Sequence, residues 1–306
     1  MPELDPPIFD WLHQRALVWF GERPVVQQVF NGFYGQVCIV QLADSTLRVV
    51  KRFRIHGFAE REYRATRLLR SMTPAHIAVP DILHFEPAAV GGWDAFVMSH
   101  IAGVNACDTP LEHADGLIAD IVALQQHWHA QGSRMFQDLL GNEYPTFAAS
   151  YRADLEARCD FLRSADGFDA AQKAALFATL DDLDPLLAPL ADDAPCFIHD
   201  DGHAANYMVD PQSWRLNAVI DPAGARYAHR ELDLFHLPDA RADFNLLDHY
   251  LAQNPCAPGW EARRYLFSLW DDIKHAELTG WRDSAWFERK LAAYAVARGA
   301  CALLEK

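Results

Sequence analysis

Residues 195–222 read PCFIHDDGHAANYMVDPQSWRLNAVIDP and place several polar side chains between short apolar runs. The runs 195–198 and 207–209 flank a polar loop, so we expect that loop to be held between two strands. The run 216–220 follows a turn rich in Asp, Pro and Ser and predicts a hairpin with 207–209. Because Asp221 ends this run, we expect it at the same end of the sheet as the loop.

The polar loop has the residue types that phosphoryl transfer requires. If the backbone is extended there, His199 and Asp201 share one face and Asp200 points to the other. Transfer of a phosphoryl group needs a carboxylate that orients a hydroxyl, and hard oxygen ligands for Mg²⁺. Asp201 is therefore the candidate catalytic base, and Asn206 and Asp221 are candidate metal ligands. The stretch predicts an ATP-dependent kinase.

A glycine-containing hairpin is predicted in the N-terminal third. Two β-rich runs, 25–30 and 36–42, are separated by the sequence NGFYG, which contains Gly32 and Gly35. Glycines at a hairpin tip allow backbone amides to approach phosphates closely. The hairpin alone is weak evidence, and it gains weight from the strand and the helix that come after it in the chain.

The next strand and helix carry a candidate ion pair. A predicted strand at 47–53 contains Lys51, and a predicted helix at 58–70 places Glu62 on its packed face. Lys51 would act as a point charge on the phosphates of ATP, with Glu62 as its partner. A single lysine or glutamate is most often a solvated surface charge. The order of hairpin, lysine, glutamate and polar loop along the chain favours the kinase interpretation.

Further stretches extend this pattern to the C-terminal third. They are DPA at 221–223, HRELDL at 229–234, PGWEARR at 258–264 and the helix-like segment 269–280. With them, the chain resembles the fructosamine (ketosamine) kinase family, within the aminoglycoside phosphotransferase and choline kinase group of the protein-kinase-like superfamily. The H-x-D-x-x-x-x-N loop and the strand-terminal Asp resemble that superfamily's catalytic loop and metal-binding position.

The resemblance implies an α+β, bilobal, protein-kinase-like fold. A β-rich nucleotide-binding lobe would span residues 1–101, and a mostly helical catalytic and substrate-binding lobe would span 102–306. The segment from Met98 to Ile101 would contact the adenine. Asp233 would brace the catalytic loop by hydrogen bonding.

The sequence indicates the substrate less clearly than it indicates the reaction type. The family's usual HGDLWxGN is HDDGHAAN at 199–206, without the bulky aromatic residue. A predicted helix at 260–278 supplies Asp271, His275 and Glu277, of which the first two share a face and could pair with a substrate amine. The alternative is a charged outer face. A ketosamine sugar is our first choice of acceptor, and an aminoglycoside, choline-like or amino-alcohol acceptor is the second.

Composition narrows the class of protein. The chain has 306 residues, 51% of them hydrophobic, and a formal charge of −15. Such a charge repels nucleic acid and favours a small, amine-bearing partner. The six cysteines show no C-x-x-C spacing, and no leader or long apolar run is present, so we expect a cytoplasmic protein that does not enter a membrane. The oligomeric state does not follow from the sequence.

Two other functions fit parts of the pattern. The cluster from His199 to His203 could belong to a metal-dependent hydrolase, although few further ligands accompany it. A protein that binds nucleotide without turnover is a third possibility. His199 itself is expected to be a buried imidazole that supports the loop, and His203 has no assigned role.

Overall fold

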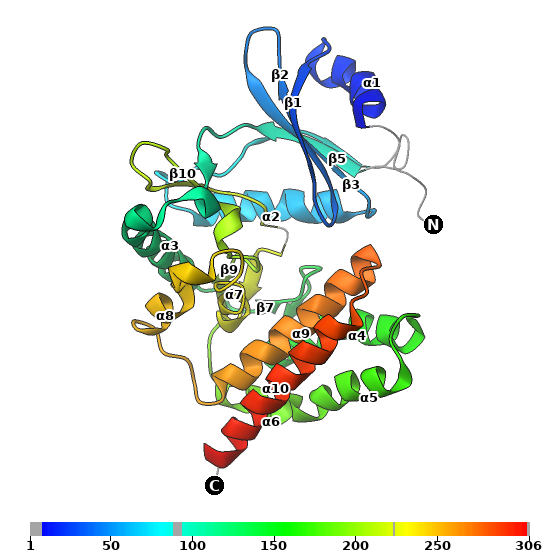
Figure 1. Cartoon of the computed structure of the whole chain (residues 1–306), viewed down its shortest axis with the longest axis vertical. Helices are drawn as coiled ribbons and strands as arrows, with labels where there is room; N and C mark the ends of the chain where they lie inside the picture. Colours follow the sequence, from blue (N-terminus) through cyan, green and yellow to red (C-terminus); the bar gives the residue numbers. More distant parts are fainter. Residues whose placement is uncertain (1–7, 88–93, 223, 305–306) are drawn as a thin grey trace.

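The protein consists of a sheet-rich N-terminal part and a mostly helical C-terminal part (Figure 1). This computed structural model describes residues 8–87, 94–222 and 224–304. The two parts confirm the expected α+β architecture. Among the described residues, no helix is long and apolar enough to cross a membrane.

The N-terminal part is built on one antiparallel sheet. Its strand order is β1-β2-β3-β5-β4, with β1 at Val25–Asn31, β2 at Gly35–Gln41, β3 at Leu47–Phe53, β4 at Ile82–Glu86 and β5 at Asp94–Ser99. Helix α1 (Ile8–Phe20) packs Trp11 and Leu12 on one face of the sheet. Helix α2 (Phe58–Met72) packs Phe58 and Ala59 on the other, against residues of β3 and β5.

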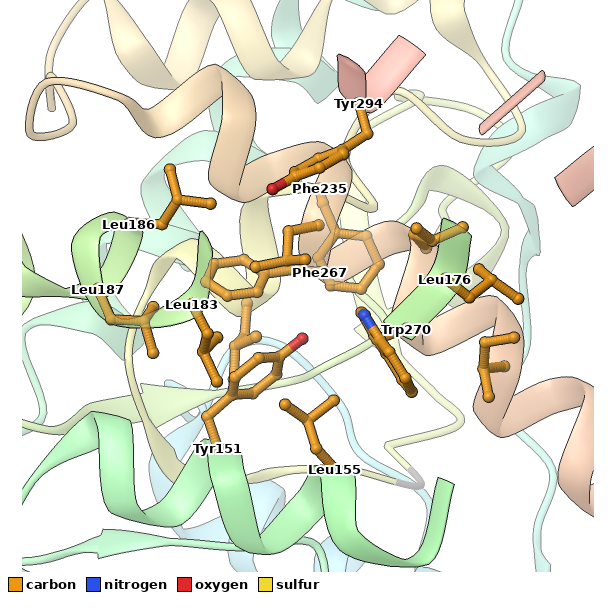
Figure 2. Close-up of a cluster of buried hydrophobic side chains, with 14 of the residues drawn as sticks. Tyr151, Leu155, Leu176, Leu183, Leu186, Leu187, Phe235, Phe267, Trp270 and Tyr294 are labelled. Atoms are coloured by element: carbon orange, nitrogen blue, oxygen red, sulfur yellow. The ribbon is translucent and has the colours of Figure 1, made fainter. Parts of the chain in front are cut away.

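The C-terminal part has a large apolar core (Figure 2). Its helices are α3 (Ala114–His129), α4 (Phe147–Ser164), α5 (Ala170–Ala178), α6 (Leu183–Leu187), α7 (Glu231–Leu234), α8 (Leu246–Leu251), α9 (Trp260–Thr279) and α10 (Ser284–Leu304). Trp270 of α9 lies at the centre of the core, and its indole nitrogen donates to the hydroxyl of Thr179 at 3.0 Å. Since α9 is held in the core by one face, its other face is available to meet the N-terminal part.

Short strands of the C-terminal part carry the polar loop. Strand β9 (Cys196–Ile198) pairs with β12 (Arg226–Ala228), and β10 (Tyr207–Val209) pairs with β11 (Leu216–Val219) and β6 (Val104–Asn105). A small hairpin, β7 (Phe136–Gln137) and β8 (Glu143–Tyr144), lies beside β12. The predicted strands around the polar loop are therefore confirmed.

The chain passes between the two parts within a few residues. The five-stranded sheet ends at Ser99, and the next strand, β6, already belongs to the C-terminal part. We retain residue 101 as the proposed boundary between the lobes.

Candidate active site

The polar loop is fixed from below by a buried carboxylate. Asp233 of α7 is fully buried and accepts the backbone N–H groups of His199 at 3.0 Å and Asp200 at 2.5 Å. The imidazole of His129 lies 3.1 Å away. Burial alone would raise the pKa of Asp233, but the hydrogen bond and charge of His129 lower it below its ordinary value. An ionised carboxylate thus holds the loop in place.

His199 is fully buried and supports the loop from within the protein. Its Nε2 donates to the carbonyl of Ile220 at 3.1 Å, and its ring stacks on that of Trp128 with centroids 5.6 Å apart. The contact with Ile220 ties the loop to the end of β11, just before Asp221. Asp200 has a φ of 65°, so the backbone is not extended there and the alternation expected from a strand does not apply.

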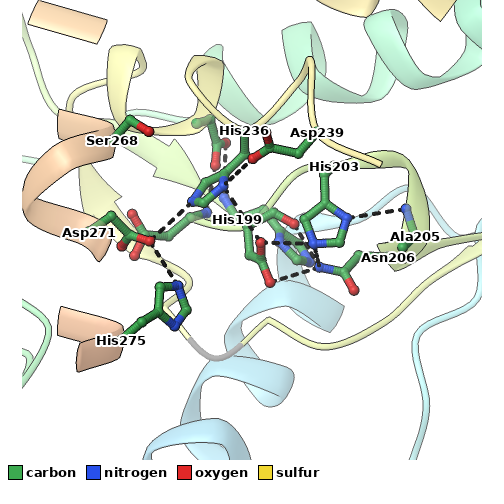
Figure 3. A network of polar contacts seen from close by, with 12 residues as sticks. His199, His203, Ala205, Asn206, His236, Asp239, Ser268, Asp271 and His275 are labelled. Carbon is green, nitrogen blue, oxygen red and sulfur yellow. Dashed lines mark hydrogen bonds and ion pairs between the residues drawn. The ribbon is translucent and has the colours of Figure 1, made fainter. Parts of the chain in front are cut away.

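Asp201 is held in place by Asn206 and His203, which are both labelled in Figure 3. One carboxylate oxygen accepts from Nδ2 of Asn206 at 2.9 Å, and the other lies 3.2 Å from Nε2 of His203. Nδ1 of His203 accepts the backbone N–H of Ala205, which leaves Nε2 to carry the proton. Burial raises the pKa of Asp201, but His203 and the nearby His236 outweigh this effect and hold it well below its ordinary value.

Asn206 and Asp221 both keep an oxygen for a cation. Nδ2 of Asn206 donates to the side chain and the carbonyl of Asp201, which leaves Oδ1 for a metal. Asp221 uses Oδ1 on Lys51, and its side chain is 44% exposed, so its second oxygen is accessible. An amide oxygen and a carboxylate oxygen are hard ligands of the type that Mg²⁺ prefers.

Lys51 joins the two parts of the chain. Its Nζ lies 2.6 Å from Glu62 of α2 and 2.5 Å from Asp221 at the end of β11. Burial lowers the pKa of this amine, but the two carboxylates raise it above its ordinary value. Lys51, Glu62 and Asp221 therefore converge on one site although they come from three separate regions of the sequence.

The space around the two hairpin glycines differs. A Cβ on Gly35 would lie 2.0 Å from the carbonyl oxygen of Arg52, so the close approach of β2 and β3 excludes a side chain there. A Cβ on Gly32 would meet nothing closer than 3.7 Å. The geometry thus explains Gly35 by strand packing, whereas room for phosphate at Gly32 and Gly35 stays a prediction.

The proposed adenine contacts lie at the end of β5. Met98 pairs with Val49 of β3 and Ile82 of β4, and its side chain packs against the apolar cluster that contains Phe58. Ile101 follows the strand and is partly buried. Contact of either residue with a nucleotide stays a prediction.

A small cavity of about 30 Å³ lies next to Asp201, under the tip of the hairpin. Its lining comes from α2, α9, the polar loop, the glycine-containing hairpin and three further segments: Tyr34, Arg61, Leu139, Asp200, Asp201, Gly224, His236, Asp271, Lys274 and His275. Tyr34 closes it by a 2.6 Å hydrogen bond between its hydroxyl and Nδ1 of His275.

The three predicted substrate residues of α9 do not behave alike. Asp271 and His275 line the cavity, and the Asp271 carboxylate is buried and lies 3.0 Å from Nε2 of His275. Lys274 forms a further ion pair with Asp271. Glu277 does not line the cavity and lies near Arg158 of α4, with which it interacts electrostatically. Because Asp271 already has cationic partners, its availability to a substrate amine is reduced.

Sequence reasoning missed three residues of this site. His236 is buried with carboxylates on several sides, and Arg61 lies in the cavity lining. Arg226 binds Asp200 at 2.6 Å and also Asp154. None of the three belongs to a sequence motif that marked the site, because packing between distant segments places them there.

The metal-hydrolase interpretation gains no support from the geometry. His199 points to the carbonyl of Ile220, whereas His203 points to Asp201. Within residues 8–87, 94–222 and 224–304, no group of three or more His, Cys, Asp or Glu side chains is arranged to hold a metal ion.

Comparison with known proteins identifies relatives along most of the chain. A protein of Escherichia coli (strain K12), described as "Uncharacterized protein YcbJ", is 29% identical over 224 residues, which cover 71% of this chain and 74% of that protein. A solved structure of a candidate fructosamine-3-kinase from Thermobifida fusca has a TM-score of 0.67 at 20% identity and covers 94% of this chain and 98% of that one.

An aminoglycoside phosphotransferase has a similar fold. The aminoglycoside phosphotransferase APH(4)-Ia, solved with AMP-PNP and hygromycin B, has a TM-score of 0.65 at 16% identity and covers 95% of this chain and 97% of that one. These likenesses show a protein-kinase-like fold. Residues 25–266 match the phosphotransferase enzyme family (APH), and the chain is therefore a member of that family.

Proposed function

We propose that the protein is an ATP-dependent kinase that transfers the γ-phosphoryl group to a hydroxyl of a small molecule. The observation that carries this proposal is the position of Lys51, between Glu62 at 2.6 Å and Asp221 at 2.5 Å. This arrangement joins a phosphate-binding lysine to a candidate metal ligand across the two lobes. Membership of the phosphotransferase family supports the same reaction class.

The nucleotide would lie between the sheet and the polar loop. Lys51 would contact its phosphates, and Asn206 and Asp221 would hold Mg²⁺ through the amide Oδ1 and the second carboxylate oxygen. Magnesium, when bound, neutralises phosphate charge and favours the transfer. The AMP-PNP in the related APH(4)-Ia structure supports the use of ATP.

Asp201 would orient the acceptor hydroxyl and receive its proton. His203 and Asn206 fix both of its oxygens, and its lowered pKa keeps it ionised at neutral pH. A carboxylate with a low pKa is a weak base. That suits a loose phosphoryl transfer, in which orientation of the hydroxyl matters more than early removal of its proton.

The acceptor class is the finer part of the proposal. The resemblance to ketosamine kinases, and the candidate fructosamine-3-kinase among the solved structures, support a ketosamine sugar as the first acceptor to test. Aminoglycosides, choline-like molecules and amino alcohols come second, supported by the aminoglycoside phosphotransferase fold. The scattered spacing of the six cysteines, without a C-x-x-C pair, supports action in the cytoplasm.

The test is the replacement of the proposed base. The variant Asp201→Asn should lower kcat by about a hundredfold or more, while the affinity for Mg·ATP stays nearly unchanged. The matched control is Asp160→Asn, since Asp160 is an exposed carboxylate of α4 far along the chain from the loop. Near-normal turnover by Asp201→Asn would contradict the assignment. Nucleotide binding without any turnover by the unmodified chain would indicate a protein that kept the fold and lost the reaction.

A further inference from the structure

Arg61 is a cationic residue in the lining of the cavity next to Asp201, and the carboxylates of Asp200 and Glu62 attract it only at longer range than an ion pair. It precedes Glu62 on α2, lines the cavity next to Asp201, and lies with its guanidinium carbon 4.2 Å from the centre of the Phe58 ring. Its Nε is buried without a hydrogen-bond partner. Among the described residues, no carboxylate forms an ion pair with it. A buried N–H donor without an acceptor is costly and is a frequent sign of a missing ligand.

The carboxylates around Arg61 already have cations. Asp200 is bound by Arg226 at 2.6 Å, and Asp271 is bound by Lys274. Asp201 lies beside His203 and 3.8 Å from Nδ1 of His236. Lys274, His236 and His275 of the cavity lining therefore each lie close to a carboxylate, whereas Arg61 does not.

Arg61 lies between the cavity next to Asp201 and a second cavity of about 120 Å³ beside the β7–β8 hairpin. The first cavity contains Asp201 and the residues of α9, whereas Lys51, Asn206 and Asp221 are not part of its lining. The nucleotide phosphates are expected beside those three residues. A group bound by Arg61 would therefore belong to the acceptor and not to ATP.

We propose that the acceptor carries an anionic group, a carboxylate or a phosphate, which Arg61 binds as the acceptor hydroxyl is presented to Asp201. This inference rests on the proposed kinase function and names its substrate class. It differs from the amine-bearing acceptor expected from composition, because the amine's expected partner, Asp271, is already bound by Lys274 and His275. An acceptor with both an amine and an acid, such as a sugar joined to an amino acid, satisfies the inference. A purely cationic acceptor does not.

Binding requires the hairpin tip to move. The cavity of about 30 Å³ has room for roughly one water molecule, which is too little for a sugar. The hydroxyl of Tyr34 and its stacking on Phe58 close it from above. Displacement of Tyr34 would open the space between Arg61 and α9.

Matched ligand pairs test the charge directly. Calorimetry on the full chain saturated with Mg·AMP-PNP would compare N-fructosyl-glycine with N-fructosyl-glycinamide, and gluconate with glucamine. In at least one pair, the acid should bind tenfold or more tightly than its uncharged or cationic counterpart. The variant Arg61→Gln should remove this difference, and Arg61→Lys should restore part of it.

The control variant is Arg67→Gln, which removes the same charge from an exposed position of the same helix and should leave the preference intact. Equal or tighter binding of the amide and the amine, or no binding of either acid, overturns the inference. An equal loss for both members of each pair in Arg61→Gln also overturns it, because Arg61 would then serve the nucleotide's phosphoryl group. If the unmodified chain does not bind Mg·AMP-PNP, the proposed kinase function itself is contradicted. If the chain binds Mg·AMP-PNP but prefers the amine-bearing ligand of each pair, only the inference of an anionic acceptor is contradicted.

Discussion

Replacement of Lys51 by Met should destabilise the fold through the buried carboxylate that it leaves behind. The Glu62 side chain is 3% exposed, and its Oε2 has no hydrogen-bond partner, so Lys51 at 2.6 Å is its main compensation. Asp221 is 44% exposed and can be solvated when the lysine is lost. Removal of one member of a buried ion pair costs about 3–5 kcal/mol, and we expect a loss of that order at pH 8.

The loss should depend on pH, because a protonated Glu62 needs no cation. Burial raises the pKa of Glu62 above its ordinary value and Lys51 counteracts this effect, so the pKa rises further in Lys51→Met. A carboxyl group whose pKa is higher in the folded state than in the unfolded state destabilises the fold as the pH rises above the unfolded value. Stability of the variant should therefore fall from pH 5 to pH 8, by at most about 1.4 kcal/mol per pH unit.

Urea unfolding at pH 5 and pH 8 measures both effects. The double variant Lys51→Met with Glu62→Gln should recover about 2 kcal/mol or more at pH 8 relative to the single variant, because the buried charge is gone. Phosphoryl transfer should stay low in both variants, since each lacks the lysine. The reasoning is refuted if Lys51→Met loses less than about 1 kcal/mol at both pH values, or if the double variant is no more stable than the single one.

The remaining predictions concern His236 and the hairpin glycine. Burial lowers the pKa of His236, but Asp239, Asp201 and Asp271 raise it from 6.5 to about 9, so its contribution to stability is complete below pH 6.5 and is lost as the pH rises through 9. His236→Gln should lack this contribution of about 3 kcal/mol to the free energy of unfolding. In urea unfolding, the difference in stability between the variant and the unmodified chain should shrink between pH 6.5 and pH 9. A difference that does not depend on pH would contradict the charge assignment. Gly35→Ala should cost about 1–3 kcal/mol or more, because its Cβ would meet the Arg52 carbonyl at 2.0 Å. Gly299→Ala, at an exposed position of α10 with open space around it, should instead stabilise by up to about 1 kcal/mol, and equal effects at the two glycines in chemical denaturation would disprove the packing argument.

The sequence predicted the local elements of the site because short-range patterns carry them. Apolar runs placed β9, β10 and β11 around the polar loop, and helical periodicity placed Glu62 on the buried face of α2. The order of Lys51, Glu62, Asp201, Asn206 and Asp221 then indicated phosphoryl transfer, which the phosphotransferase family match supports.

Short-range sequence patterns could not predict which charged residues form ion pairs with each other. Asp271 lies three residues from Lys274 and four from His275, and a helix allows either contact, so only the structure shows that the carboxylate binds both. Asp200 was expected to point away from the site, whereas its positive φ and the ion pair with Arg226 place it in the cavity lining.

By itself, the sequence determined which backbone segments form and which chemical groups stand at their ends, because hydrophobic periodicity and turn residues act over a few positions. The tertiary structure alone decided that Lys51 meets Asp221, 170 residues away, and that the buried Nε of Arg61 has no hydrogen-bond partner. The physical reason is that a charge is paired by whatever the fold brings within a few ångströms of it, and that distance depends on packing between segments far apart in the chain.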